Sequence, residues 1–157
     1  MESPFAPDFC EFLSVLNSNG VEYLIVGGYA VAHYGHLRTT GDLDVWIAVD
    51  QKNAERVRAA LAKFGFPAGS TTPEDFTRPN GILRMGVPPV RIEILNGISG
   101  VNFASCYANR VAAKFGGVPA NVISRDDLLA NKRAAGRHKD LDDVENLIRI
   151  AAKKPRT

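Results

Sequence analysis

The chain has 157 residues, of which 45% are hydrophobic and 23% are charged, and its formal net charge is +2. This length and this balance fit a globular protein with one hydrophobic core. No apolar run approaches the roughly 18 residues that cross a bilayer, so no membrane partner is expected, and the small net charge does not by itself indicate nucleic acid.

The segment Met1–Pro4 has neither the basic nor the apolar region of a secretory signal, so we expect a cytoplasmic protein. Cys10 and Cys106 are the two cysteines. A disulfide between them is one alternative, but free thiols are the expectation in a reducing cytosol.

The first part of the chain is predicted to alternate helices with short strands. The elements are a helix over 8–18, a strand over 23–26, a short helix over 29–34, a strand over 42–49 and a helix that Asp50 caps. Asn19–Gly20 ends the first helix, and Gly27–Gly28 closes the first strand. Val57, Leu61 and Phe64 share one face of the third helix, as expected of a helix that covers a core.

The remaining chain is predicted to contain a loop, four strands and three helices. The loop covers 66–80, the strands cover 82–85, 90–95, 111–115 and 118–123, and the helices lie around Phe103, over 124–135 and from about Leu141 to before Pro155. Ser124 and Asp127 resemble a capping box, and Gly116–Gly117 is a hairpin signal.

The last helix is predicted to bury the face that carries Leu141, Val144, Ile148 and Ala151. Asp140 and Asp143 are acids near the start of this helix. The helix macrodipole favours acids in a first turn, so neither residue needs a functional site to explain it. The elements together predict one α/β (α+β) domain over 1–157. It would be a small mixed β-sheet flanked by helices, with a helical C-terminal part from about residue 124.

Two carboxylates, Asp42 and Asp44, form the clearest local pattern. Side chains alternate along a strand, so both acids lie on one face while Leu43 and Val45 lie on the other. Mg²⁺ prefers oxygen ligands and commonly combines a few carboxylates with substrate phosphates. The pattern therefore predicts a metal–nucleotide site, with two solvated acids on an edge strand as the alternative.

A glycine turn precedes these acids. Gly27 and Gly28 lie between a strand and a helix start, where bare backbone lets phosphate oxygens approach closely. A tight turn that only needs a positive φ is the alternative. Arg38 and Thr39 follow, and they offer a cation and a hydroxyl for phosphates or belong to a plain surface loop.

Glu93 supplies a third acid. It lies in an apolar strand whose alternation turns Ile92 and Ile94 inward and places Arg91 and Glu93 on the other face. A carboxylate in such a strand needs a partner. A metal ion and an ion pair with Arg91 are equally supported locally.

At this point the chain resembles the DNA polymerase β-like nucleotidyltransferase superfamily, through Gly27–Ala30, Arg38–Val45 and Arg91–Ile94. Within it, the chain is similar to small bacterial stand-alone proteins related to the AbiEii-type toxins, and more distantly to the lincosamide nucleotidyltransferases. The segment Lys132–Leu147 also resembles the C-terminal helices of those proteins. Two departures are Gly28, where many members have Ser, and Glu93, where the third acid is often Asp.

The resemblance implies a nucleotidyltransferase fold with the site at one end of the sheet. The residues expected at the site are, for metal binding and catalysis, Asp42, Asp44 and Glu93, and for the nucleotide, Gly27, Gly28, Tyr29, Arg38, Thr39 and Lys132. Two Mg²⁺ (or Mn²⁺) ions would be bound by the acids. Lys132 would contact phosphate from the C-terminal helices, or else be a solvated lysine.

The expected reaction is transfer of a nucleoside monophosphate from a nucleoside triphosphate to a hydroxyl of an acceptor, which is a small molecule, a protein or an RNA end. The alternative is a catalytically weak nucleotide-binding component of a toxin–antitoxin pair that acts through an antitoxin or another protein partner. A glycosyltransferase, which also uses an Asp-x-Asp pair, is disfavoured because the chain is short. The three histidines show no zinc-ligand spacing.

Overall fold

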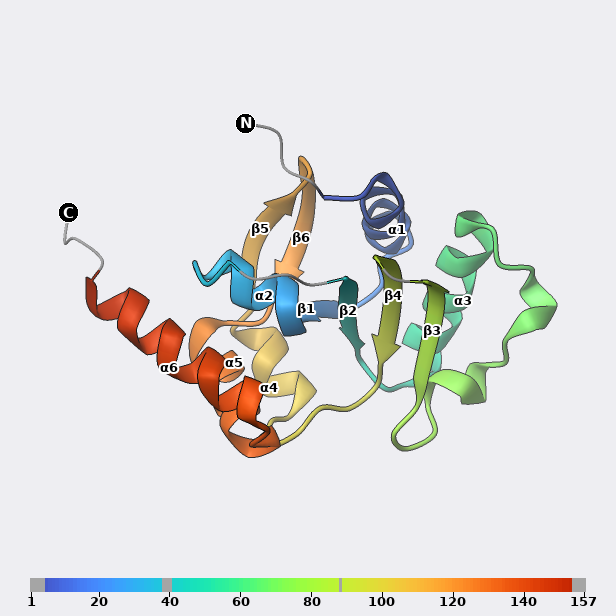
Figure 1. Cartoon of the computed structure of the whole chain (residues 1–157). Helices are drawn as coiled ribbons and strands as arrows, with labels where there is room; N and C mark the ends of the chain where they lie inside the picture. Colours follow the sequence, from blue (N-terminus) through green and yellow to red (C-terminus); the bar gives the residue numbers. More distant parts are fainter. Residues whose placement is uncertain (1–4, 38–40, 88, 154–157) are drawn as a thin grey trace.

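The computed structural model describes residues 5–37, 41–87 and 89–153 and shows a six-stranded mixed sheet with helices around it (Figure 1). The strands are β1 (Tyr23–Val26), β2 (Asp42–Ile47), β3 (Ile82–Val87), β4 (Val90–Leu95), β5 (Val111–Phe115) and β6 (Val118–Val122). The helices are α1 (Pro7–Ser18), α2 (Gly27–His33), α3 (Gln51–Phe64), α4 (Phe103–Ala108), α5 (Arg125–Ala135) and α6 (His138–Lys153). The predicted α/β class is confirmed.

The strand order is β3-β4-β2-β1-β6-β5. Strand β2 lies antiparallel to β1 and parallel to β4, and β6 lies parallel to β1. The hairpin partners β3 and β5 form the two outer edges. The register pairs Val26, the last residue of β1, with Asp44, so the start of α2 lies next to the acid pair of β2.

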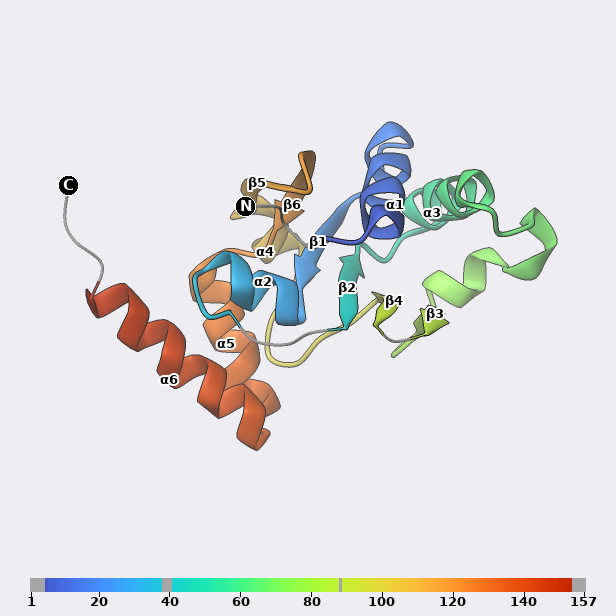
Figure 2. The same cartoon turned by 45° about the horizontal axis from the view of Figure 1, so that its top comes forward.

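One face of the sheet is apolar and forms the main core. Paired residues point to the same side, so Leu43 and Val45 of β2 lie beside Ile92 and Ile94 of β4, and all four are buried. Helices α1 and α3, which lie side by side in Figures 1 and 2, contribute their own buried apolar faces to this core. The other face of β2 and β4 is therefore left for polar residues.

The predicted helix caps are confirmed. Asp50 accepts a hydrogen bond from the backbone N–H of Asn53 at 2.7 Å, and Ser124 accepts one from that of Asp127 at 3.2 Å. Cys10 and Cys106 are free thiols. No helix within the described residues combines the length and the hydrophobicity of a bilayer-spanning segment.

The prediction for the buried face of α6 is wrong except for Val144, which is buried as expected. Leu141 and Ile148 are 49% and 43% exposed. The buried stripe instead contains Asp140, Asp143, Val144 and Leu147. It packs against α5, where the buried Lys132 pairs with both carboxylates, so the acids can lie inside.

The predicted loop over 66–80 contains two short 3₁₀ turns, η1 (Ala68–Ser70) and η2 (Pro73–Phe76). The second begins with a capping box in which Thr72 and Asp75 each bond the backbone of the other. Phe76 is buried and ties this turn to the core.

Candidate active site

The turn from β1 into α2 requires glycine at its first position. Gly27 has a φ of +71°, which side chains rarely adopt. A Cβ atom at Gly27 would lie only 2.1 Å from Oδ2 of Asp44. The positive φ and the close approach thus both fall on Gly27, whereas Gly28 is a buried residue within α2.

We expect Gly27→Ala to lower the free energy of unfolding by about 1–3 kcal/mol, because alanine would be held in a disfavoured conformation. The same methyl group would displace Asp44 and weaken nucleotide binding. Gly69→Ala is the matched comparison, since a Cβ atom there would meet no atom within 4 Å and stability should hold. Urea unfolding of both variants measures this difference, and equal losses would contradict a special role for Gly27.

Strand alternation and register bring three carboxylates together. Asp42 and Asp44 share one face of β2, and Glu93 lies opposite Asp44 on the neighbouring strand β4. One oxygen from each of Asp42, Asp44 and Glu93 lies within 4.8 Å of the other two. The structure thus gathers the three acids from sequence positions that are far apart.

Two arginines on the same face pair with the outer acids. Arg91 makes a two-pronged contact with Asp42, with nitrogen–oxygen distances of 3.1 and 2.9 Å. Arg84 of β3 donates through Nε to Glu93 at 2.8 Å, whereas Arg91 lies 3.8 Å from Glu93. The ion pair of Glu93 is therefore chiefly with Arg84, a residue that the sequence did not indicate.

Asp44 is the least compensated of the three acids. Its Oδ1 is buried and has no hydrogen-bond partner within the described part of the chain. Burial, followed by the charges of Glu93 and Asp42, raises the pKa of Asp44 to about 7. A cation placed between these carboxylates would reverse that cost.

The raised pKa predicts that Asp44→Asn stabilises the metal-free protein, and more so as pH rises. The Asp44 carboxyl has an ordinary pKa of 3.8 and a folded pKa of about 7, so unfolding releases a proton between these values. The wild-type protein therefore loses on the order of 3 kcal/mol as pH rises to 7, and little beyond. Urea unfolding of both proteins at pH 5 and pH 8, without divalent cations, measures the effect. An equal gain at both pH values would contradict the raised pKa.

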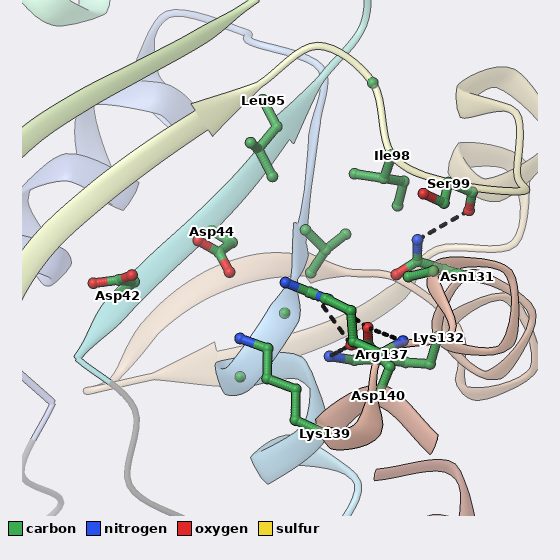
Figure 3. A pocket seen from close by; sticks show the side chains of 15 residues that line it. Asp42, Asp44, Leu95, Ile98, Ser99, Asn131, Lys132, Arg137, Lys139 and Asp140 are labelled. Atoms are coloured by element: carbon green, nitrogen blue, oxygen red, sulfur yellow. Dashed lines mark hydrogen bonds and ion pairs between the residues drawn. The ribbon is translucent and has the colours of Figure 1, made fainter. Parts of the chain in front are cut away.

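A pocket of about 280 Å³ adjoins these acids (Figure 3). Asp42 and Asp44 line one side of it, and Gly27 and Gly28 also line it. Glu93 is not among the lining residues of this pocket, so of the three acids it lies outside the pocket wall. The pocket can thus hold a ligand that reaches Asp42 and Asp44 from the α5–α6 side.

The opposite wall of the pocket is basic, and Lys132 is its most buried cation. The Nζ atom of Lys132 lies 3.2 Å from Asp140 and 3.1 Å from Asp143, whose side chains are 0% and 1% exposed. Burial opposes ionisation of Asp140, but hydrogen bonds from Arg137 and the charge of Lys132 outweigh it and lower the pKa of Asp140. Lys132 is thus neither a solvated lysine nor a cation without a counter-charge.

Arg137 and Lys139 are the more exposed cations of this wall. Arg137 donates through Nε to Asp140 at 2.6 Å, and its side chain is 63% exposed. Figure 3 shows Arg137 and Lys139 reaching from the start of α6 toward the side of Asp42 and Asp44. These two residues were not singled out in the sequence, although both fall within a segment that resembles the C-terminal helices of known nucleotidyltransferases.

Tyr29, a further predicted site residue, lies away from the pocket. Tyr29 packs its ring against Phe5, Phe9 and Phe115 at centroid distances of 5.2, 5.7 and 6.4 Å, and it is not among the pocket-lining residues. Burial and the charge of Asp42 raise the pKa of Tyr29. Arg38 and Thr39 lie outside the described residues.

Comparisons with known proteins identify the family of the chain and a similar fold. A family model described as "Nucleotidyl transferase of unknown function (DUF2204)" matches residues 6–156. The fold is also similar to the crystal structure of a "putative nucleotidyltransferase" from Thermotoga maritima, with a TM-score of 0.55 and 13% identity over 92% of this chain and 90% of that one. At this identity the likeness bears on the fold alone. No curated protein matches the chain.

Proposed function

Since the chain belongs to this family of nucleotidyl transferases, we propose that it moves a nucleoside monophosphate from a metal-bound nucleoside triphosphate to a hydroxyl of an acceptor. The observation that carries the metal dependence is the acid cluster, in which the buried Oδ1 of Asp44 has no partner within the described residues. We place the reaction at the junction of β1, α2, β2 and β4.

The acid cluster suits Mg²⁺ or Mn²⁺. These ions prefer oxygen ligands, and Asp42, Asp44 and Glu93 offer carboxylate oxygens within 4.8 Å of one another. Asp42 and Asp44 would hold the ions, with Glu93 completing the site. When bound, divalent cations would offset charge on the reacting phosphate and on the leaving oxygen.

The rest of the pocket suits the triphosphate. The backbone at Gly27 and Gly28 presents no side chain toward the pocket floor, so phosphate oxygens can approach it. Arg137 and Lys139 would contact the phosphates, because their charged groups are exposed beside the pocket. Lys132 would support phosphate binding indirectly. It pairs with Asp140, and Asp140 accepts three hydrogen bonds from Arg137.

The transfer step needs a proton acceptor near the attacking hydroxyl. As the acceptor oxygen bonds the α-phosphorus, its proton would pass to Glu93 or Asp44. The bond from the α-phosphorus to the bridging oxygen breaks, and pyrophosphate leaves with the electron pair. The attacking and leaving oxygens lie roughly in line, so the acceptor approaches from the side opposite the pyrophosphate.

The test is transfer of label from each α-labelled nucleoside triphosphate, with Mg²⁺ or Mn²⁺ and a cell lysate as the source of acceptors. We expect a labelled product together with pyrophosphate, and loss of both when EDTA removes the cations. Transfer that proceeds unchanged in EDTA would refute the metal-dependent reaction.

A second candidate is a nucleotide-binding toxin–antitoxin component with weak or no catalysis. Two ion pairs favour this candidate, that of Asp42 with Arg91 and that of Glu93 with Arg84. They engage carboxylates that a metal ion would otherwise use. The exposed Leu141 and Ile148, one heptad apart on α6, offer an apolar contact for a protein partner. Binding of Mg–nucleoside triphosphate without pyrophosphate release would favour this candidate.

A further inference from the structure

The pocket has a third wall whose chemistry differs from that of the acidic and basic walls. Leu95 and Ile98 are half-buried apolar side chains at this wall, and Ser99 and Asn131 lie next to them (Figure 3). A nucleoside triphosphate is divided in the same way. Its phosphates are anions that suit the basic wall and bound metal, and its base is a flat ring with polar edges that suits the apolar wall.

Asn131 has a fixed orientation at this wall. Its Nδ2 donates a hydrogen bond to the backbone carbonyl of Ser99 at 3.0 Å. A carbonyl oxygen can only accept, so turning the amide over would set two oxygens against each other. The Oδ1 atom of Asn131 therefore remains as the acceptor that this side chain offers to a ligand.

Resting on the proposed function, we infer that this wall binds the nucleobase and that Asn131 selects bases with an amino group at C6 of a purine or C4 of a pyrimidine. The ring would lie on Leu95 and Ile98, with its polar edge toward the Oδ1 atom of Asn131. At that position adenine and cytosine carry an amino group, whereas guanine and uracil carry a carbonyl oxygen. The carbonyl would face Oδ1 as a second acceptor, with no hydrogen between them.

The preference should be measurable as a ratio of affinities. Adenine or cytosine would gain a hydrogen bond, whereas guanine or uracil would leave an oxygen unpaired. This contrast corresponds to about a tenfold difference in Kd. We expect Mg–ATP and Mg–CTP to bind about tenfold more tightly than Mg–GTP and Mg–UTP. Mg–tripolyphosphate, which has no base, should bind at the same pocket through its phosphates alone.

Calorimetry with these five ligands on wild-type protein and on Asn131→Leu provides the test. Leucine keeps the size of the side chain but has no acceptor, so the tenfold ratio should fall to about one while tripolyphosphate affinity stays the same. Asn146→Leu on α6, outside the pocket, is the matched control and should keep the ratio.

Each outcome decides the inference. A wild-type protein that binds all four nucleotides equally, or prefers GTP and UTP, would overturn it even if Asn131→Leu fails to fold. An unchanged ratio in a folded Asn131→Leu would also overturn it, and in both cases intact tripolyphosphate binding would leave the proposed function standing. If neither tripolyphosphate nor any nucleotide binds, the proposed function itself fails.

Discussion

Replacing either Asp42 or Asp44 by asparagine is expected to lower nucleotidyl transfer on the order of 10³-fold. The two carboxylates share one face of β2, and that of Asp44 lies directly against Gly27. Metal stabilisation of a transferring phosphate is worth several kcal/mol, and each 1.36 kcal/mol is about tenfold in rate. Initial rates of pyrophosphate release, with saturating Mg²⁺, measure the loss.

The two variants should differ in stability, which separates lost chemistry from lost folding. Asp44→Asn removes a buried charge that its neighbours oppose, so its free energy of unfolding should rise in the absence of metal. Asp42→Asn removes the partner of Arg91 and should be neutral or slightly destabilising. A stable but inactive Asp44→Asn therefore identifies a functional carboxylate.

Asp126→Asn is the control for this pair. Its side chain is 94% exposed, and its carboxylate lies 3.7 Å from the guanidinium of Arg125. Activity and stability should both stay near the wild-type values. If Asp44→Asn kept full activity with Mg²⁺ present, the assignment of this acid to the metal would be wrong.

Lys132→Met is expected to produce the largest loss of stability, about 3–5 kcal/mol. It would leave Asp140 and Asp143 buried without the cation that lies 3.2 and 3.1 Å from them. Arg137 still reaches Asp140, and the Nε2 atom of His36 lies 3.8 Å from Asp143. Thermal and urea unfolding near pH 7 measure the loss.

Two comparisons show whether Lys132 acts through this network. Arg133→Met alters an exposed neighbour on the same helix and should be nearly neutral. Adding Asp140→Asn and Asp143→Asn to Lys132→Met removes the stranded charges and should restore part of the stability. If Lys132→Met instead kept its stability and lost only tripolyphosphate affinity, Lys132 would be a direct phosphate contact.

Much of the fold could be predicted from local patterns. Helix α1 differs by one residue at its start from the predicted range, and β1 and β4 coincide with theirs. Caps such as Ser124 act within a few residues, so the sequence alone reveals them. Strand alternation predicted that Ile92 and Ile94 point inward, and their burial confirms this prediction.

Register was harder to predict, and it decides the partner of Glu93. The expected end of the third strand at Met85 would leave Gly86 and Val87 in the turn. In the structure β3 continues to Val87, which pairs with Val90, and this places Arg84 opposite Glu93. The exposed edge strand carried no periodic signal strong enough to fix that register.

The buried charges of α6 could not be predicted because carboxylates are ordinarily exposed. The set Asp140, Asp143, Val144 and Leu147 follows helical spacing as well as the apolar set that was expected. The position of Lys132 across the α5–α6 contact gives both acids a buried counter-charge, so the acidic stripe can be the inner one. That contact depends on tertiary packing, which local patterns do not contain.

The most direct test is the position of Mn²⁺ by anomalous diffraction, in crystals with a nucleoside triphosphate analogue that cannot be cleaved between the α- and β-phosphates. We predict Mn²⁺ bound to Asp42 and Asp44, beside Glu93, with the triphosphate running from Gly27–Gly28 toward Arg137. Another group of oxygen and nitrogen ligands, His36, Asp142 and Asp143, also lies within 4.8 Å of one another. Mn²⁺ found only there, or a triphosphate away from the glycine turn, would contradict the proposed active site.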